Sequence, residues 1–275
     1  YQFTNLVNGQ QYFFAVVAVD SNNNANNSVT PVAATPTDTL APEEVTNVQV
    51  VSQATALDIS WAASTNTAGD LGNYRVYFNG DAGTVVPSTQ TTHSVTGLSP
   101  SSGYPIRVTA VDTTGNETTG ISITGVTELT NPTGITTSPF SGMVGLSWSP
   151  TVPSNLVQSY ALYTSPTNFT SVQGMTPRVT IAANQTTRRV AGLTNNTLYY
   201  FAVTAINLSG GENQTVTTVS ETPVPDVDGP IVSNIQYNGA ALTNGTVIST
   251  NGTISLQATD PSGVGRVDFA LDGVS

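Results

Sequence analysis

The sequence contains neither cysteine nor lysine, and its single histidine is His93. Without cysteine there is no disulfide framework and no thiolate-ligated metal site, so packing alone must hold each domain together. One histidine also excludes a metal site built from several histidines. A catalytic triad would have to use His93, but the chain has no Gly-x-Ser-x-Gly motif to supply its nucleophile. We therefore predict an ordinary strand position for His93.

Charge is scarce and mostly negative. Six arginines stand against 17 acidic residues, which gives a net charge of −11, and charged residues make up only 8% of the chain. An ordinary soluble domain has about 25%. Nucleic acid is excluded as a partner because phosphate binding needs a cationic surface.

Long hydrophobic runs are also missing. No stretch approaches the roughly 18–20 apolar residues of a membrane-spanning helix, so no membrane insertion is predicted for this segment. No basic-then-apolar signal segment opens the chain, so sequence outside it would have to direct export. Val, Ile, Leu, Tyr and Phe instead alternate with polar residues, which is typical of half-buried strands. We predict a folded, all-β protein.

Internal repeats define the organisation of the chain. Leu6, Leu98 and Leu193 are each followed six residues later by a tyrosine, at Tyr12, Tyr104 and Tyr199. Each tyrosine opens an alternating strand that ends in a small and a branched residue, which are Ala18-Val19, Ala110-Val111 and Ala205-Ile206. The leucines are 92 and then 95 residues apart, which is the length of one β-sandwich domain.

A matching front half precedes the second and third copies. Leu57-Asp-Ile-Ser-Trp61 corresponds to Val144-Gly-Leu-Ser-Trp148, and Tyr74-Arg-Val-Tyr77 corresponds to Tyr160-Ala-Leu-Tyr163. Turn-forming stretches separate these strands. The loops after the repeated strands, Asp112 to Glu117 and Asn207 to Glu212, are interpreted as turns, and neither contains Arg-Gly-Asp.

These landmarks resemble the fibronectin type III fold. The resemblance covers about residues 1–222 and implies tandem antiparallel β-sandwiches arranged as beads on a string. It also implies that Trp61 and Trp148 are buried in the cores. Tyr12, Tyr104 and Tyr199 would each bond a nearby backbone group as a tyrosine corner.

The predicted boundaries divide the chain into four segments. Residues 1–38 carry only the last strands of a fibronectin type III-like domain, whereas 39–129 and 130–225 are complete. Residues 226–275, with Ile231–Ile235, Thr253–Val264 and Val267–Gly273, are similar to the first half of a bacterial immunoglobulin-like domain. We expect both end segments to be sections of something longer, or to be completed by strand addition from other chains. Short proline-marked linkers between the segments predict a semi-rigid rod.

Acidic residues supply the candidate sites for chemistry. Asp226, Asp228 and Asp260 lie near a domain junction, and their hard oxygen atoms suit Ca²⁺, although no EF-hand motif is present. They are a candidate calcium site, with acids that merely flank a turn as the alternative, and no other cofactor is predicted. Asp20 with Glu43, or Asp58 with Asp70, could be read as the acid and base of a glycosidase. These acids have no flanking aromatic subsite, so we predict solvated acids and no enzymatic activity.

Surface glycans are another candidate partner class. Phe140 and Phe169 are the best loop aromatics for stacking on a sugar, although core packing explains most aromatic residues of the chain. Asn-x-Ser/Thr sequons mark candidate glycosylation sites, which require a source with the oligosaccharide machinery. They occur at Asn26, Asn116, Asn168, Asn184, Asn195, Asn207, Asn213, Asn244 and Asn251.

Two functional hypotheses follow. The first is a structural or adhesive section of a large secreted or cell-surface protein, a rod, stalk or fibre subunit that pairs with other domains or copies of itself through exposed edge strands. The alternative is a set of non-catalytic spacer modules in a secreted enzyme that degrades polysaccharide or protein. Both place the chain outside the cell, and the flanking sequence would discriminate between them.

Overall fold

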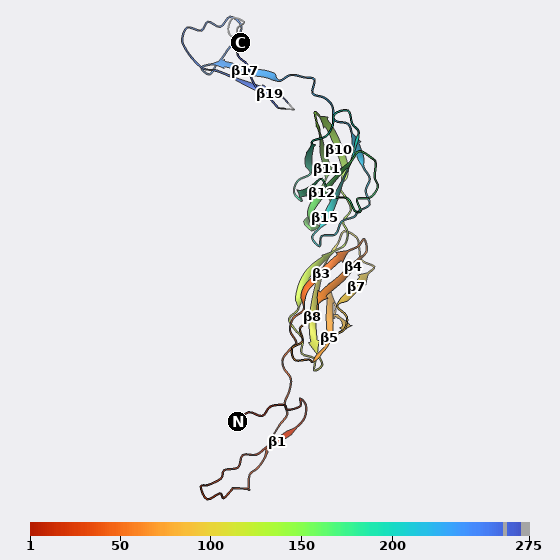
Figure 1. Cartoon of the computed structure of the whole chain (residues 1–275), viewed down its shortest axis with the longest axis vertical. Helices are drawn as coiled ribbons and strands as arrows, with labels where there is room; N and C mark the ends of the chain where they lie inside the picture. The colour runs from red at the N-terminus through yellow and green to blue at the C-terminus, as the bar shows by residue number, and fades with distance from the viewer. Residues whose placement is uncertain (261–262, 271–275) are drawn as a thin grey trace. The chain divides into compact units, whose positions relative to one another are not determined.

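A computed structural model describes residues 1–260 and 263–270. In these residues the regular structure consists of antiparallel strands and one short 3-10 turn, η1 (Ser154–Leu156). No helix in the described residues is long and apolar enough to cross a membrane. The strands fall into four successive segments, two of which are sandwiches (Figure 1). This confirms the prediction of an all-β chain with tandem antiparallel sandwiches.

The module 39–129 is a sandwich of two sheets. One sheet has the order β3-β4-β7 and the other has the order β6-β5-β8-β9. The strands are β3 (Thr46–Ser52), β4 (Ala56–Ala62), β5 (Leu71–Phe78), β6 (Thr84–Pro87), β7 (Thr92–Thr96), β8 (Gly103–Asp112) and β9 (Ile121–Val126). Neighbouring strands in both sheets are antiparallel. Hairpins and longer connections reverse the direction of the chain between them.

Alternation along β4 and β5 builds the core of this module. Leu57, Ile59 and Trp61 point inward from β4, and Tyr74 and Val76 point inward from β5. The rings of Trp61 and Tyr74 meet edge to face with centroids 5.4 Å apart. Such a pair adds about 0.5–1.5 kcal/mol to the burial of its area. The predicted core position of Trp61 agrees with its 5% exposure.

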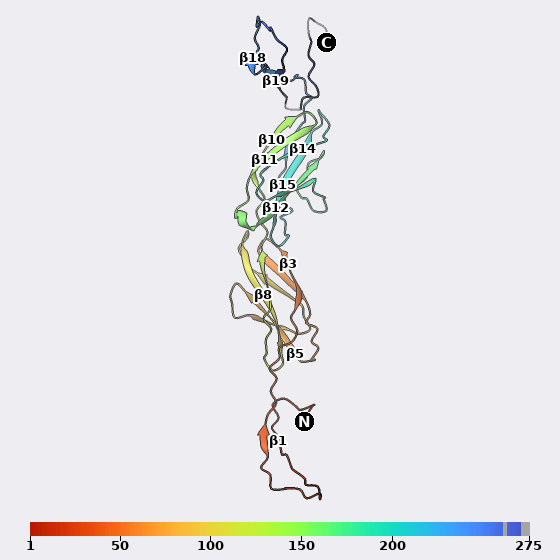
Figure 2. The ribbon, with the colours of Figure 1, turned by 90° about the vertical axis from the view of Figure 1, so that its left-hand side faces the viewer.

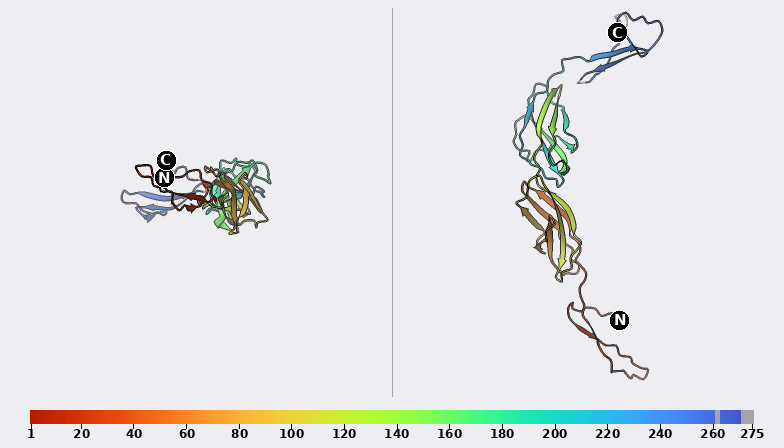
Figure 3. Two further views of the ribbon diagram at one scale, coloured as in Figure 1. Left: turned by 90° about the horizontal axis from the view of Figure 1, so that it is seen from below. Right: turned by 180° about the vertical axis from the view of Figure 1, so that it is seen from behind.

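The module 130–225 repeats this architecture. Its sheets have the orders β10-β11-β14 and β13-β12-β15-β16; Figure 2 shows the first of them with β10, β11 and β14 labelled. The strands are β10 (Thr133–Phe140), β11 (Met143–Ser149), β12 (Val157–Ser165), β13 (Val179–Ala182), β14 (Thr187–Ala191), β15 (Tyr199–Asn207) and β16 (Val219–Glu221). Both sandwiches are also visible from behind in Figure 3.

The second core uses the same residue types as the first. Trp148 is 4% exposed, and its ring meets that of the fully buried Tyr160 at 5.6 Å, again edge to face. The hydroxyl of Tyr160 accepts the backbone N–H of Thr151 at 3.1 Å. In the first module the hydroxyl of Tyr74 accepts the N–H of Ser64 at the same distance. Each core tyrosine therefore packs through its ring and satisfies its polar end inside the module.

The three repeated tyrosines make the same contact. The Tyr12 hydroxyl accepts the N–H of Val7 at 2.9 Å. Tyr104 and Tyr199 accept the N–H groups of Ser99 and Thr194, at 3.0 and 3.2 Å. In every case the donor lies five residues before the tyrosine, directly after the repeated leucine. This is the geometry of a tyrosine corner, which ties the crossing between sheets to the strand that follows.

The N-terminal segment, residues 1–38, contains one short hairpin. β1 (Tyr12–Phe14) pairs with β2 (Val32–Ala34), and an isolated bridge joins Val19 to Ala25. The alternating strand predicted from Tyr12 to Val19 is therefore shorter than expected, ending at Phe14. Val16 is 89% exposed, because this segment offers no second sheet against which the alternating residues could pack.

The C-terminal segment, residues 226–275, contains a three-stranded sheet in the order β18-β17-β19. The strands are β17 (Ile231–Tyr237), β18 (Ala240–Ala241) and β19 (Ile254–Thr259). Residues 263–270 form no strand, and the rest of the strand predicted at Val267–Gly273 lies outside the described residues. The immunoglobulin-like character of this segment stays a prediction.

Candidate functional site

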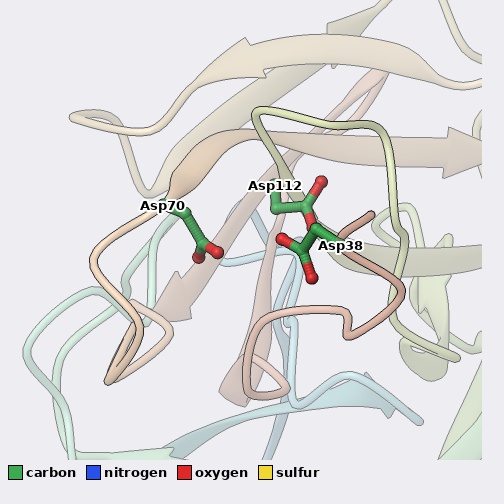
Figure 4. A group of neighbouring side chains, drawn as sticks. All are labelled: Asp38, Asp70 and Asp112. Carbon is green, nitrogen blue, oxygen red and sulfur yellow. The ribbon is translucent and has the colours of Figure 1, made fainter. Parts of the chain in front are cut away.

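Three carboxylates converge at one end of the module 39–129. Asp38 precedes the module, Asp70 directly precedes β5, and Asp112 is the last residue of β8. An oxygen atom of each lies within 4.8 Å of the others, and Figure 4 shows the three side chains approaching from separate segments. We call Asp38, Asp70 and Asp112 the acidic cluster.

A bulge at Gly72 brings two members of the cluster together. The pairing of β5 with β8 shifts by one residue between Leu71 and Asn73, so Gly72 is the extra residue. A Cβ atom at Gly72 would lie 2.8 Å from the carbonyl oxygen of Asp112, a distance that no side chain tolerates. The N–H of Thr113 also donates to the carbonyl oxygen of Asp70 at 2.8 Å. Glycine thus allows the close approach that places Asp70 beside Asp112.

Asp112 organises the loop that follows β8. Its Oδ1 accepts the backbone N–H groups of Thr114, Gly115 and Asn116 at 2.9, 2.6 and 2.8 Å. Its Oδ2 accepts the side-chain amide of Asn116 at 2.8 Å. Burial opposes the charge of this carboxylate, which is 3% exposed, but the hydrogen bonds outweigh burial and lower the pKa of Asp112.

The cluster presents hard oxygen atoms, the ligand type that Ca²⁺ and Mg²⁺ prefer. Oδ1 of Asp70 is buried and has no hydrogen-bond partner in the described part of the chain. The loop capped by Asp112 is nevertheless complete without a cation. Asn207 caps the corresponding loop of the second module, where Leu156 takes the place of Asp70. The arrangement is that of a capped turn with two further acids beside it.

The acids predicted as a calcium site lie elsewhere. Asp228 and Asp260 line one cavity, together with Ile231 of β17 and Thr259 of β19. Oδ1 of Asp226 accepts the backbone N–H of Asp228 at 3.3 Å. The structure thus places Asp228 near Asp260 and uses Asp226 in a local turn. Calcium at these residues stays a prediction.

The other candidate catalytic residues are engaged locally. His93 is half-buried on β7, opposite Ile59. Asp20 caps its own loop by accepting the N–H groups of Asn22 and Asn24. Glu43 accepts the N–H of Thr67 at 3.0 Å. None of these contacts brings an acid and a base to a shared cleft.

A network that the sequence reasoning missed occurs in both modules. In the first, Glu117 accepts the hydroxyls of Tyr77 and Thr109 at 2.6 and 2.7 Å. Arg75 adds an ion pair to Glu117 at 3.1 Å. In the second module, Glu212 accepts the hydroxyls of Tyr163 and Thr204 in the same way. The two loops interpreted as turns are therefore each anchored by a glutamate to the four-stranded sheet.

The contacts of these two networks shift the pKa values of Glu117 and Tyr163. Burial raises the pKa of Glu117, but the hydrogen bonds from Tyr77 and Thr109 and the charges of Arg75 and Arg107 outweigh it, so the net shift is downward. In the second module, burial and the bond to Glu212 hold the pKa of Tyr163 far above its ordinary value. Glu117 is therefore ionised and Tyr163 neutral throughout the neutral range.

Replacing Glu117 by glutamine is expected to destabilise the module 39–129 by about 1–2 kcal/mol at pH 7, because charge-assisted hydrogen bonds are lost. The folded pKa of Glu117 lies below its ordinary 4.5. Its contribution is therefore complete above pH 4.5 and is lost as the pH falls through the folded value. Urea unfolding, followed by Trp61 fluorescence in a Trp148→Phe background, measures the difference.

The same measurement at low pH provides the control for Glu117→Gln. The variant and the parent should converge in stability as the pH falls below the folded pKa of Glu117, where the parent carboxylate is protonated as well. A stability difference that does not shrink as the pH is lowered from 7 would contradict an electrostatic role for Glu117.

The predicted sugar-stacking residues are already covered. The guanidinium of Arg189 lies 4.6 Å from the ring centroid of Phe140, and the same ring lies against Gly145. Phe169 is half-buried and packs on a core cluster that includes Val172. Neither ring is a free platform for a pyranose.

The sequons differ in accessibility. Asn207 is fully buried, and its Oδ1 accepts the N–H groups of Ser209 and Gly211 at 2.9 and 2.8 Å. The folded module encloses this amide, and glycosylation at Asn207 stays a prediction. Among the others, Asn26, Asn168, Asn184, Asn244 and Asn251 are exposed, and Asn116, Asn195 and Asn213 are half-buried.

Three bacterial relatives align with most of the chain. Chitinase A1 of Niallia circulans is 28% identical over 229 residues, which is 79% of this chain and 31% of that protein. Endoglucanase B of Cellulomonas fimi is 30% identical over 205 residues, 67% of this chain and 19% of that protein. Exoglucanase B of the same species is 29% identical over 269 residues, 90% of this chain and 23% of that protein. The chain thus spans less than a third of each relative.

The chain is also similar to solved structures, two of which are from chicken. The FN1-FN3 domains of chicken CNTN1 are 18% identical, with a TM-score of 0.45, 80% of this chain and 79% of that chain being covered. A two-domain segment of chicken tenascin is 20% identical, with a TM-score of 0.31, 65% of this chain and 98% of that chain being covered.

The family model of the fibronectin type III domain matches residues 41–126. The module 130–225 repeats the strand order of these residues in both sheets. It also repeats the buried tryptophan–tyrosine pair and the tyrosine corner. Residues 41–126 therefore form a fibronectin type III domain, and the module 130–225 repeats its fold.

Proposed function

We propose that the chain is a set of non-catalytic modules within a secreted enzyme that degrades a polysaccharide such as chitin or cellulose. The observation that carries this proposal is the alignment with a chitinase and two glucanases over 205 to 269 residues. In each the aligned region is a minor share of the whole enzyme. In this proposal the fibronectin type III domains space other domains of the enzyme apart and do not act on the substrate.

The geometry supports a spacing role. Each complete module has its own closed core around one tryptophan–tyrosine pair. The acids predicted to be solvated or turn-forming are bonded to their own loops or sheets. A shaft or fibre subunit remains the second candidate, because successive sandwiches with separate cores suit that role as well.

Activity assays on the whole secreted protein that contains this segment test the proposal. We expect that protein to release soluble sugars from chitin or cellulose. Deletion of residues 39–225 should lower the rate on the insoluble polymer several-fold and leave the rate on a short soluble oligosaccharide unchanged. A surface-anchored protein without glycosidase activity would overturn the proposal in favour of the shaft.

A further inference from the structure

The outer face of the sheet β10-β11-β14 carries a groove of about 650 Å³. Strand alternation turns Thr136, Ser147 and Arg189 outward, and Gly145 forms the floor between them. Residues 184–186, which precede β14, complete the lining. We call this feature the sheet groove. Its volume falls in the range of about 300–1,000 Å³ that is usual for ligand sites.

The first module fills the corresponding place with one of its own side chains. The two registers align through Trp61 and Trp148, so Asp58 corresponds to Gly145 and Ser94 corresponds to Arg189. The Asp58 carboxylate accepts the Ser94 hydroxyl and the Gln53 side-chain amide, both at 2.5 Å. In the second module, Gly145 leaves a hollow where the first module has the Asp58 carboxylate. The guanidinium of Arg189 takes the place of the Ser94 hydroxyl that donates to this carboxylate.

Charge distinguishes the second module from the rest of the chain. Residues 130–225 contain three arginines and two acids, a net charge of +1, within a chain of net charge −11. Two of these arginines, Arg188 and Arg189, line the sheet groove, and no acid lines it. Neither forms an ion pair within the described residues. Their charge is thus uncompensated at an open, polar surface.

We propose that the sheet groove binds a carboxylate-bearing polysaccharide. A uronic acid carboxylate lies over Gly145, where the first module places Asp58, and pairs with the guanidinium of Arg189. Arginine suits this role because its planar fork binds a carboxylate through two hydrogen bonds. This activity goes beyond spacing and does not depend on any enzyme in the same protein.

The remaining lining favours a sugar polymer over an acidic peptide. Hydroxyls of Thr136, Ser147 and Thr187 and the side-chain amides of Asn184 and Gln185 offer donors and acceptors to ring hydroxyls. The aromatic ring of the lining, Phe140, is covered by Arg189, so it provides no pocket for a peptide side chain. An open polar groove suits an extended, hydroxyl-rich chain.

Isothermal titration of the 275-residue chain with oligogalacturonate tests the proposal. We expect saturable binding that weakens as salt is added, because an exposed charge pair is screened. Arg189→Ser, which installs the first module's residue, should weaken binding at least tenfold. Gly145→Asp should do the same by placing a carboxylate in the groove. Its Cβ would lie 3.1 Å from Cε2 of Phe140, a side chain that can move.

Arg107→Ser is the matched control, since it removes an arginine that also stacks on an aromatic ring, Tyr77, but in the other module. It should change the affinity less than twofold. Trp148 fluorescence during urea unfolding in a Trp61→Phe background verifies that Arg189→Ser and Gly145→Asp are folded, and Trp61 fluorescence in a Trp148→Phe background does the same for Arg107→Ser. Equal losses in Arg107→Ser and Arg189→Ser, equally tight binding of a neutral glucan or of polyglutamate, or no saturable binding by the parent chain would each overturn the proposal. None of these outcomes bears on the polysaccharide-degrading enzyme proposed above.

Discussion

Replacing Tyr160 by alanine is expected to destabilise the module 130–225 by about 3–5 kcal/mol, the range for removing a large aromatic side chain from a core. Tyr160 is fully buried, packs on Trp148 and bonds the N–H of Thr151. Much of the stability of a small domain would be lost. The chain has two tryptophans, one in each module. Urea unfolding followed by Trp148 fluorescence in a Trp61→Phe background therefore reports this module alone.

Tyr160→Phe separates the two contributions of this residue. It keeps the ring and removes only the hydroxyl, so a loss of about 1–2 kcal/mol is expected from the unpaired N–H of Thr151. Trp61 fluorescence in a Trp148→Phe background should show an unchanged midpoint for the first module in both Tyr160 variants. A shift of both midpoints by the same amount would contradict separate cores.

Asp112→Ala is expected to have the next largest effect, a loss of about 2–4 kcal/mol for the module 39–129 at pH 7. The change removes a charged acceptor that serves three backbone N–H groups and the side-chain amide of Asn116, and hydrogen bonds to charged groups are the stronger ones. Trp61 fluorescence during urea unfolding in a Trp148→Phe background measures it.

Asp112→Asn is the matched control, because Asn207 performs the same task in the second module. Its amide oxygen can keep the backbone bonds, so we expect a loss of less than about 1 kcal/mol, the usual net value of one hydrogen bond. The pKa of Asp112 lies below its ordinary 3.8 in the folded module. The carboxylate therefore stabilises fully above pH 3.8, and this contribution is lost as the pH falls through the folded value. If Asp112→Asn and Asp112→Ala were equally unstable, the capping role would be wrong.

The core could be predicted because its landmarks are repeated in the sequence. Trp61 and Trp148 each lie in a strand of alternating pattern, 13 and 12 residues before Tyr74 and Tyr160. Period-two alternation fixes which face of a strand is buried, so the inward positions follow directly. The tyrosine corners were implied by family resemblance, which supplied the partner that spacing alone does not identify.

The acidic cluster could not be predicted in this way. Asp38, Asp70 and Asp112 lie far apart in sequence and meet because a bulge at Gly72 lets β5 approach β8. A single glycine near the start of a strand does not by itself reveal a bulge. The sequence pattern of paired acids led instead to Asp58 with Asp70, although the partners of Asp58 are Gln53 and Ser94.

The sequence contains a pattern from which the roles of Glu117 and Glu212 could have been predicted. Glu117 and Glu212 each follow the capping residue, Asp112 or Asn207, by five positions. The two loops that end in these glutamates were matched in the repeats, but they were interpreted only as turns. The strand predicted up to Val19 failed for the opposite reason: its alternation is clear, but a strand needs a second sheet to bury its apolar face.

The lack of lysine, together with the placement of arginine, has a consequence for proteolysis. Proteases of trypsin-like specificity cleave after basic residues and require the substrate as a free, extended segment. Arg75 lies within β5 and Arg107 within β8, and both strands are paired on two sides. Arg188 and Arg189 lie within β14. Cleavage at these four bonds requires a strand to leave its sheet, so folding protects these four sites from such proteases.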